Sequence, residues 1–324
     1  MTNRHIAKID FLRGIAILMV FLFHAQLVFF PDSNDLHYSD KGILQGGLRD
    51  LALRFSPTAF GWTGVQLFLV ISGYLIHRNY LLNGSILNAA IFFNKRFWRI
   101  YPPYIFVLFV MIILLPFTVY GGSNLMDIIS HVFLFHNFSE TYIFGINPSF
   151  WSIALEAQLY LLYPFFLYVR HRWGVTQAFG LSLSIAVFLK IMEPIFTNQE
   201  YYNAYYLSPG ALWYNWCAGA LLVEFHYYKI LIFRGHAGKV AIIATLLLFS
   251  SRLFPFHYYL MHLLAILTWV SIMEWYLLYK TIRIGKKLFN LMTTLGLCSY
   301  SFYLIHQPLL KVLFSFYNQI VGYL

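Results

Sequence analysis

Charged residues are scarce in this chain, and their scarcity decides its class. Only 10% of the 324 residues are Asp, Glu, Lys or Arg, whereas 60% are hydrophobic. A soluble chain of this length carries about a quarter of its residues as charges, which cover its surface. The composition therefore excludes an ordinary soluble protein and predicts an all-α fold, a polytopic transmembrane helical bundle.

Cysteines are also few. Cys217 and Cys298 lie in apolar stretches far apart in the sequence. Two such thiols indicate neither a disulfide framework nor a zinc site, so we expect them to be packing residues. No cluster of histidines and carboxylates has metal-ligand spacing, and no metal is expected. The chain shows no repeat, low-complexity tract or soluble appendage, which predicts one membrane domain over residues 1–324.

Apolar runs predict about nine membrane spans, or ten if one short segment also crosses. That segment, 125–138, contains Asp127, His131 and His136, so we expect it to be re-entrant or peripheral. A surface helix is expected within 43–55. The predicted spans cover about 9–30, 60–77, 103–120, 150–169, 175–196, 205–225, 238–254, 258–279 and 295–318.

The formal net charge of +10 sits mostly in short loops and indicates orientation in a bilayer rather than nucleic-acid binding. Arg4, His5 and Lys8 place the amino terminus in the cytoplasm by the positive-inside rule. The first apolar run is too long for a signal peptide and lacks a small-residue cleavage site, so we expect it to be retained. The expectation is a multi-pass protein of the plasma (inner) membrane, with the side of the carboxy terminus left open.

The first predicted span carries three ionisable residues, Asp10, Arg13 and His24. Arg13 and His24 are eleven residues apart, which puts them on one helical face about 16 Å apart along the axis. Ionisable groups inside a span are costly and usually face a bundle interior or a watery cavity. We therefore expect a functional site along this stripe.

A basic stretch follows the second predicted span and is expected to be a cytoplasmic loop. Arg96 and Arg99 are three residues apart on one helical face, with Lys95 beside them. Guanidinium groups bind phosphates bidentately, so the stretch is a candidate phosphate site. An ordinary anchor beside anionic lipid headgroups explains it equally well.

A further polar stretch opens the predicted span at 150–169. Ser152, Glu156 and Tyr160 recur every four residues and share one face, so Tyr160 can hydrogen-bond Glu156. A carboxylate inside a span needs a partner, for which Arg13 and His24 are candidates. A purely structural buried pair is the alternative.

The last predicted span contains another histidine, His306, on the same helical face as Ser299 and Tyr303. Its role is either in the site or in a structural hydrogen bond of the core. His262 has no polar neighbour at helical spacing beyond Tyr258, and we assign it a structural role.

Together these residues resemble the integral-membrane acyltransferase 3 family of O-acyltransferases. The matching stretches are short one by one, but they follow the family order over almost the whole chain. They are Asp10 to Ala16 followed by His24, Gly64 to Leu75 with Ser72, Arg96 to Pro102, Phe150-Trp151-Ser152 with Glu156 and Tyr160, and Ser299 to Pro308.

The resemblance implies transfer of an acyl group, commonly acetyl, from cytoplasmic acyl-CoA to a hydroxyl of a sugar, polysaccharide precursor or lipid-linked sugar. His24 matches the family's catalytic histidine, Arg13 its first-helix arginine, and Arg96 and Arg99 its paired arginines. Some members add a soluble esterase-like domain after the membrane part. Because this sequence ends at Leu324, we expect acceptor handling in the membrane domain or through a partner.

The residues suit this chemistry. Acyl transfer needs a base for the hydroxyl proton, and a neutral imidazole at His24 can serve as that base or carry the acyl group itself. Lys95, Arg96 and Arg99 would hold the phosphates of the coenzyme, with its arm passing Arg13. Arg13 could be held by Asp10, three residues earlier on the helix, or could act in catalysis by polarising the thioester. Glu156 would orient His24 or bind an acceptor hydroxyl.

The remaining polar residues, Asp10, Ser72, Trp151, Tyr160 and His306, are expected in acceptor or supporting roles. A transporter with a polar path along the first span is the main alternative, but no inverted repeat or pair of broken helices favours it. A non-catalytic membrane partner protein is a third possibility. Membrane lipids are expected contacts, and nucleic acid is not.

Overall fold

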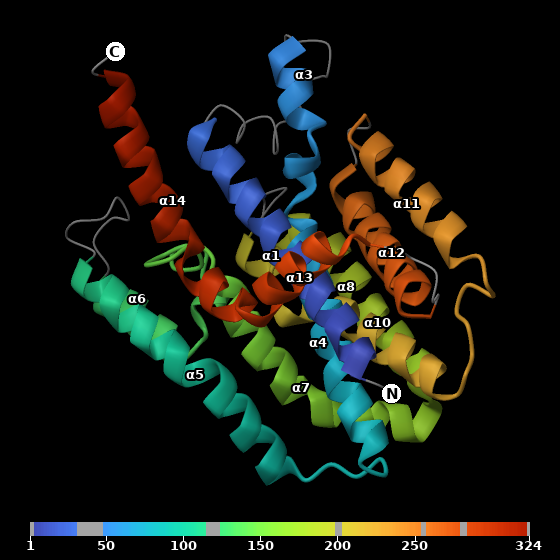
Figure 1. Cartoon of the computed structure of the whole chain (residues 1–324). Helices are drawn as coiled ribbons and strands as arrows, with labels where there is room; N and C mark the ends of the chain where they lie inside the picture. The colour runs from blue at the N-terminus through green and yellow to red at the C-terminus, as the bar shows by residue number, and fades with distance from the viewer. Residues whose placement is uncertain are drawn as a thin grey trace. The chain divides into compact units, whose positions relative to one another are not determined.

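The computed structural model describes residues 3–30, 48–114, 124–197, 203–253, 257–278 and 284–322 (Figure 1). Within these ranges the regular structure is helical, and no strand occurs. The predicted all-α class is therefore confirmed. The main helices are α1 (Asn3–Phe29), α4 (Thr63–Leu82), α5 (Ala89–Leu114), α7 (Trp151–Trp173), α8 (Val175–Thr197), α10 (Pro209–Tyr227), α11 (Ala237–Ser251), α12 (His257–Leu278), α13 (Lys286–Leu297) and α14 (Ser299–Gly322).

Five of the described helices are long and apolar enough to cross a membrane, or up to six if a bent pair counts as one span. This makes the chain a multi-pass membrane protein. The bent pair is α13 and α14, which meet at an angle of 82°. The predicted span 295–318 is therefore wrong in its start, because the chain turns at Cys298. That cysteine is exposed, whereas Cys217 is buried as expected.

The basic stretch is helical rather than a loop, which corrects the prediction that the span begins at 103. Helix α5 starts at Ala89 and runs through Pro102 and Pro103. A proline inside a helix leaves the carbonyl four residues earlier without its usual donor. Here those carbonyls belong to Trp98 and Arg99, whose exposed positions let other donors reach them.

The segment 125–138 forms a short helix, α6 (Leu125–Val132), and a turn of 3-10 helix, η4 (His136–Phe138). Eight residues rise only about 12 Å, so α6 is too short to cross a membrane. Its Asn124 cap accepts a hydrogen bond from the Asp127 amide at 2.8 Å. The surface helix expected within 43–55 is α3 (Leu48–Arg54), and residues 43–47 lie outside the described ranges.

The chain divides into two compact units, one of residues 1–71 with 230–324 and one of residues 72–229. In the first unit α1 packs along α13 and α14, and α11 lies beside α12 (Figure 1). Gly14 and Gly296 allow the close crossing of α1 and α13, because each faces backbone atoms of the other helix.

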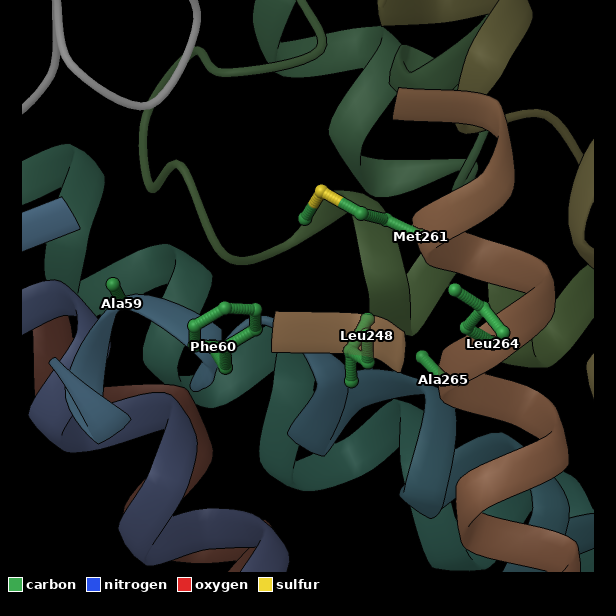
Figure 2. Packing of buried hydrophobic residues seen from close by; sticks show 6 residues of the cluster. All are labelled: Ala59, Phe60, Leu248, Met261, Leu264 and Ala265. Carbon is green, nitrogen blue, oxygen red and sulfur yellow. The ribbon is translucent and has the colours of Figure 1, made fainter. Parts of the chain in front are cut away.

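The first unit also buries an apolar cluster under the 3-10 turn η2 (Pro57–Phe60). Figure 2 shows this cluster, to which η2, α11 and α12 contribute. Arg252 lies beside this cluster. The Arg252 guanidinium donates hydrogen bonds to the carbonyls of Arg54 at 2.8 Å and Ala59 at 2.9 Å, and it stacks over the ring of Phe60. The cluster consists of Ala59, Phe60, Leu248, Met261, Leu264 and Ala265.

In the second unit α8 packs against α7 and α10. Helix α10 begins where the sequence signals it: the Ser208 hydroxyl accepts from the Ala211 amide at 3.2 Å, and Pro209 occupies the first turn. Two tyrosine hydroxyls of α5 hydrogen-bond to backbone carbonyls of the short helix α6. Tyr101 donates to the Val132 carbonyl at 3.0 Å, and Tyr104 donates to that of His131 at 2.9 Å.

Candidate functional site

The polar stripe predicted on the first span lies on one uninterrupted helix, α1. Arg13 Nη1 is 3.5 Å from Asp10 Oδ1, and both side chains are largely buried, at 17% and 14% exposure. Because α1 is continuous, Arg13 and His24 keep their separation of about 16 Å along the axis. They therefore occupy two levels of the same face rather than one cluster.

His24 contacts His306 of α14. The distance from His24 Nδ1 to His306 Nε2 is 3.1 Å, and the two ring centroids are 5.0 Å apart. His24 Nδ1 is also 2.9 Å from the Val20 carbonyl oxygen, and His306 Nδ1 is 2.7 Å from that of Tyr303. His306 is fully buried, so this imidazole pair sits at the packed crossing of α1 and α14.

Glu156 of α7 forms a second polar group with Ser72 of α4. The Ser72 hydroxyl donates to Glu156 Oε1 at 3.1 Å, and the hydrogen bond expected from Tyr160 reaches the same oxygen at 2.5 Å. Among the described residues, Oε2 has no hydrogen-bond partner. Ser152 turns instead to the Ser149 carbonyl, at 3.1 Å.

Arg96 joins this group to the basic stretch of α5. Its guanidinium lies 5.5 Å from the centroid of the Tyr160 ring and 5.8 Å from that of Phe92. Its Nε is buried and has no hydrogen-bond partner in the described part of the chain. Tyr160 thus holds Glu156 with its hydroxyl and supports Arg96 with its ring.

The other residues of the basic stretch lie at the surface. Lys95 and Arg99 are both exposed, whereas Arg96 is half-buried. Trp151, the first residue of α7, is rotated about 140° around the helix from Glu156 and does not share its face.

The predicted site residues therefore fall into two groups, one in each compact unit, and each group is described within its own unit. Asp10, Arg13, His24 and His306 belong to the first unit. Ser72, Lys95, Arg96, Arg99, Trp151, Glu156 and Tyr160 belong to the second. Within the described ranges no group of three or more His, Cys, Asp or Glu side chains could hold a metal ion.

A buried ionic cluster at the ends of three helices was not predicted. Glu224 of α10 binds Arg170 of α7 at 2.8 Å and His77 Nε2 of α4 at 2.6 Å. His77 Nδ1 is 3.2 Å from the Tyr163 hydroxyl. A histidine and a glutamate inside apolar helices were the available signals, but their sequence separation of 147 residues concealed the pairing.

The polar residues of segment 125–138 also form a buried cluster. The rings of His131 and His136 stack with centroids 3.8 Å apart, and His131 Nδ1 lies 3.0 Å from Asp127 Oδ1. Burial, with the nearby His131 ring adding to it, lowers the pKa of His136 to about 3. The side chains of Asn137 and Gln158 hold this segment against α7 through two amide hydrogen bonds of 2.9 and 2.7 Å.

The contacts of His262 agree with the structural role expected from the sequence. It is buried, and its Nδ1 is 2.8 Å from Gln66 Nε2 of α4, a partner on another helix that spacing within one span does not reveal. The Trp62 ring covers its face, with centroids 4.4 Å apart. A hydrogen-bonded and stacked imidazole of this kind fits a packing role.

The chain is similar to a family of known proteins. A family model described as an acyltransferase domain matches residues 6–322. The peptidoglycan O-acetyltransferase OatA of Listeria monocytogenes is 28% identical over 216 residues, 59% of this chain and 30% of that protein. Nodulation protein 10 of Rhizobium leguminosarum is 26% identical over 255 residues, 72% of this chain and 64% of that protein. The O-acetyltransferase OatA of Staphylococcus aureus is 30% identical over 162 residues, 43% of this chain and 26% of that protein.

The aligned part of the chain spans less than two thirds of each of these relatives. No solved structure matches the chain. The family match, however, runs through the α1 stripe, the basic stretch of α5 and the α14 histidine. Because it covers nearly the whole sequence, this multi-pass membrane protein belongs to the acyltransferase 3 family.

Proposed function

We propose that this protein is a membrane O-acyltransferase. It moves an acyl group, acetyl in the simplest case, from cytoplasmic acyl-CoA to a hydroxyl of a carbohydrate acceptor at or across the membrane. The observation that carries the proposal is His24, an imidazole inside an apolar span that is hydrogen-bonded to a second imidazole. Two relatives are named as O-acetyltransferases, one of them for peptidoglycan, which supports acetyl transfer to a sugar.

In this proposal His24 acts as the general base. Its imidazole takes the proton of the acceptor hydroxyl while the hydroxyl oxygen attacks the thioester carbonyl. The tetrahedral intermediate then collapses, the carbon–sulfur bond breaks, and the leaving thiolate takes the proton from the imidazolium. An acyl group carried briefly on His24 gives the same products in two steps.

The basic stretch supplies the donor site. Arg96 is held in place by the rings of Tyr160 and Phe92, so its guanidinium is oriented before a phosphate arrives. Lys95 and Arg99 are exposed beside it and add two further positive charges. Coenzyme A carries its phosphates at one end of a long flexible arm, which suits a charged entrance some distance from the reacting thioester.

Arg13 lies about 16 Å from His24 along α1, too far to polarise the carbonyl that reacts there. We therefore assign Arg13, positioned by Asp10, to the passage of the donor arm. An extended arm bridges a gap of this size, whereas a short acyl donor does not. The proposed orientation has the amino terminus in the cytoplasm.

Glu156 is assigned to a substrate hydroxyl. Its Oε1 accepts from Ser72 and Tyr160, which fixes the carboxylate and points Oε2 to a further donor. Its alternative role, orienting His24, has less support because His24 Nδ1 already has two acceptors in its own unit. Ser72 and Tyr160 thus serve as supports, and Trp151 lies at the entry of the same helix.

Mass spectrometry of surface glycans and lipid-linked sugars tests the function, in cells with and without the intact gene. We expect the acceptor to lose the mass of one acyl group when the gene is deleted. Purified protein in vesicles should then move label from acyl-CoA to that acceptor without net solute flux. Solute flux without label transfer would establish the transporter alternative instead.

A further inference from the structure

We infer that His306 is a positioning residue that fixes the tautomer of His24, so that Nε2 of His24 is the nitrogen that accepts the proton. The assignment of tautomers stands on hydrogen-bond geometry alone. Only its catalytic consequence rests on the proposed function.

The first step concerns His306. Its Nδ1 is 2.7 Å from the Tyr303 carbonyl oxygen, and a carbonyl only accepts hydrogen bonds. His306 Nδ1 must therefore carry hydrogen. In a neutral imidazole the other nitrogen then has a lone pair, so His306 Nε2 is an acceptor.

The second step concerns His24. His306 Nε2 faces His24 Nδ1 at 3.1 Å, so the hydrogen between the two rings belongs to His24. The Val20 carbonyl, 2.9 Å from the same Nδ1, imposes the same choice because it also only accepts. Two acceptors converge on one N–H group, and the Nε2 lone pair of His24 remains for the substrate.

The opposite arrangement fails at Val20. If His306 Nε2 donated to His24, the Nδ1 lone pair of His24 would face the carbonyl oxygen of Val20 at 2.9 Å. Two lone pairs at that distance repel each other. The Tyr303 carbonyl requires hydrogen on Nδ1 of His306, and the Val20 carbonyl requires hydrogen on Nδ1 of His24. The hydrogen bond between the two rings is therefore donated by His24 and accepted by His306.

Val20 alone does not hold the ring, because it belongs to the same helix and the side chain can rotate away from it. His306 comes from α14, is fully buried, and is itself bound to Tyr303. When His24 takes the acceptor proton, the new imidazolium donates a charge-assisted hydrogen bond to His306 Nε2. This is the orienting task that a carboxylate performs in hydrolase triads, carried out here by a neutral ring.

The test combines nitrogen NMR with kinetics on the full chain. Protein carrying ¹⁵N-histidine in lipid nanodiscs should show a protonated Nδ1 and an unprotonated Nε2 for His24, assigned by the signals lost in His24→Ala. His306→Ala should mix the two tautomers and lower kcat about 10- to 100-fold with little change in KM for acyl-CoA. His306→Gln retains a hydrogen-bond acceptor, so it should recover most of the wild-type kcat and most of the single-tautomer spectrum of His24.

His262→Gln is the matched control, since it alters another buried histidine of the same unit and should leave the His24 signals unchanged. A wild-type His24 protonated at Nε2 overturns the inference, even if His306→Ala does not fold. An unchanged His24 spectrum in a folded His306→Ala protein overturns it too. The expected tautomer together with full activity of His24→Ala would instead refute the proposed function and leave the tautomer assignment standing.

Discussion

The crossing of α1 and α13 makes a sharp prediction about stability. A Cβ added at Gly14 would lie 2.7 Å from the carbonyl carbon of Met292, and one added at Gly296 would lie 2.7 Å from that of Asp10. Ordinary contact begins at 3.4 Å, and the carbonyl oxygens of Met292 and Asp10 lie closer to the added Cβ than these carbons do, so Gly14→Ala or Gly296→Ala must push the helices apart by well over about 0.7 Å. Neither obstacle is a side chain that can rotate away.

A gap of that size forfeits a quarter to a half of the dispersion energy of the atom pairs across it. Overpacking of this kind costs about 1–3 kcal/mol. We expect Gly14→Ala to lower the apparent Tm by about 3–8 °C. The double variant should cost less than the sum of the two single variants, because one separation of the helices relieves both clashes.

The assay is thermal unfolding of purified protein in a fixed detergent, followed by tryptophan fluorescence and by loss of the monodisperse peak. Gly180→Ala is the matched control, because a Cβ there meets no atom within 4 Å. It should leave Tm unchanged or raise it, since alanine favours a helix more than glycine does. A Gly14→Ala protein as stable as Gly180→Ala would refute the close packing of α1 on α13.

Three further predictions concern the second unit. Glu224→Gln should destabilise the protein by about 1–3 kcal/mol because it leaves the half-buried Arg170 without its anion; an apparent Tm close to wild type would contradict this. His136 stays neutral in the folded protein, so stability should fall as the pH drops below about 6.5 towards 3, by up to about 1.4 kcal/mol per pH unit. His136→Phe should flatten that slope in thermal melts, and an unchanged slope would assign it to other groups. Arg96→Lys loses the stacking on Tyr160 and should raise KM for acyl-CoA about tenfold with kcat nearly unchanged; an unaltered KM would remove Arg96 from the donor site.

Contacts within one helix could be predicted from the sequence, and contacts between helices could not. Helical spacing placed Arg13 beside Asp10 and Tyr160 beside Glu156, and the structure contains both contacts. His24 and His306 are 282 residues apart, so no spacing rule connects them. The composition predicted the helical class because a chain with so few charges has few alternatives.

Helix boundaries show the same limit. The turn between α13 and α14 has no proline, and close to it Gly296 packs tightly against the backbone of α1. Prolines 102 and 103 indicated a helix start, yet α5 begins thirteen residues earlier, at Ala89, and runs through both of them. Whether a helix ends at a glycine or continues through a proline depends on tertiary packing and on whether solvent or other donors reach the freed backbone carbonyls. Neither can be inferred from a single sequence.

The role of His24 is tested most directly by acyl transfer in a purified His24→Ala protein that melts like wild type and still binds acyl-CoA. We expect the rate of label transfer from acyl-CoA to the acceptor to fall at least about 100-fold, with binding of the donor retained. Transfer at the wild-type rate by that protein would contradict the assignment of His24 as the base.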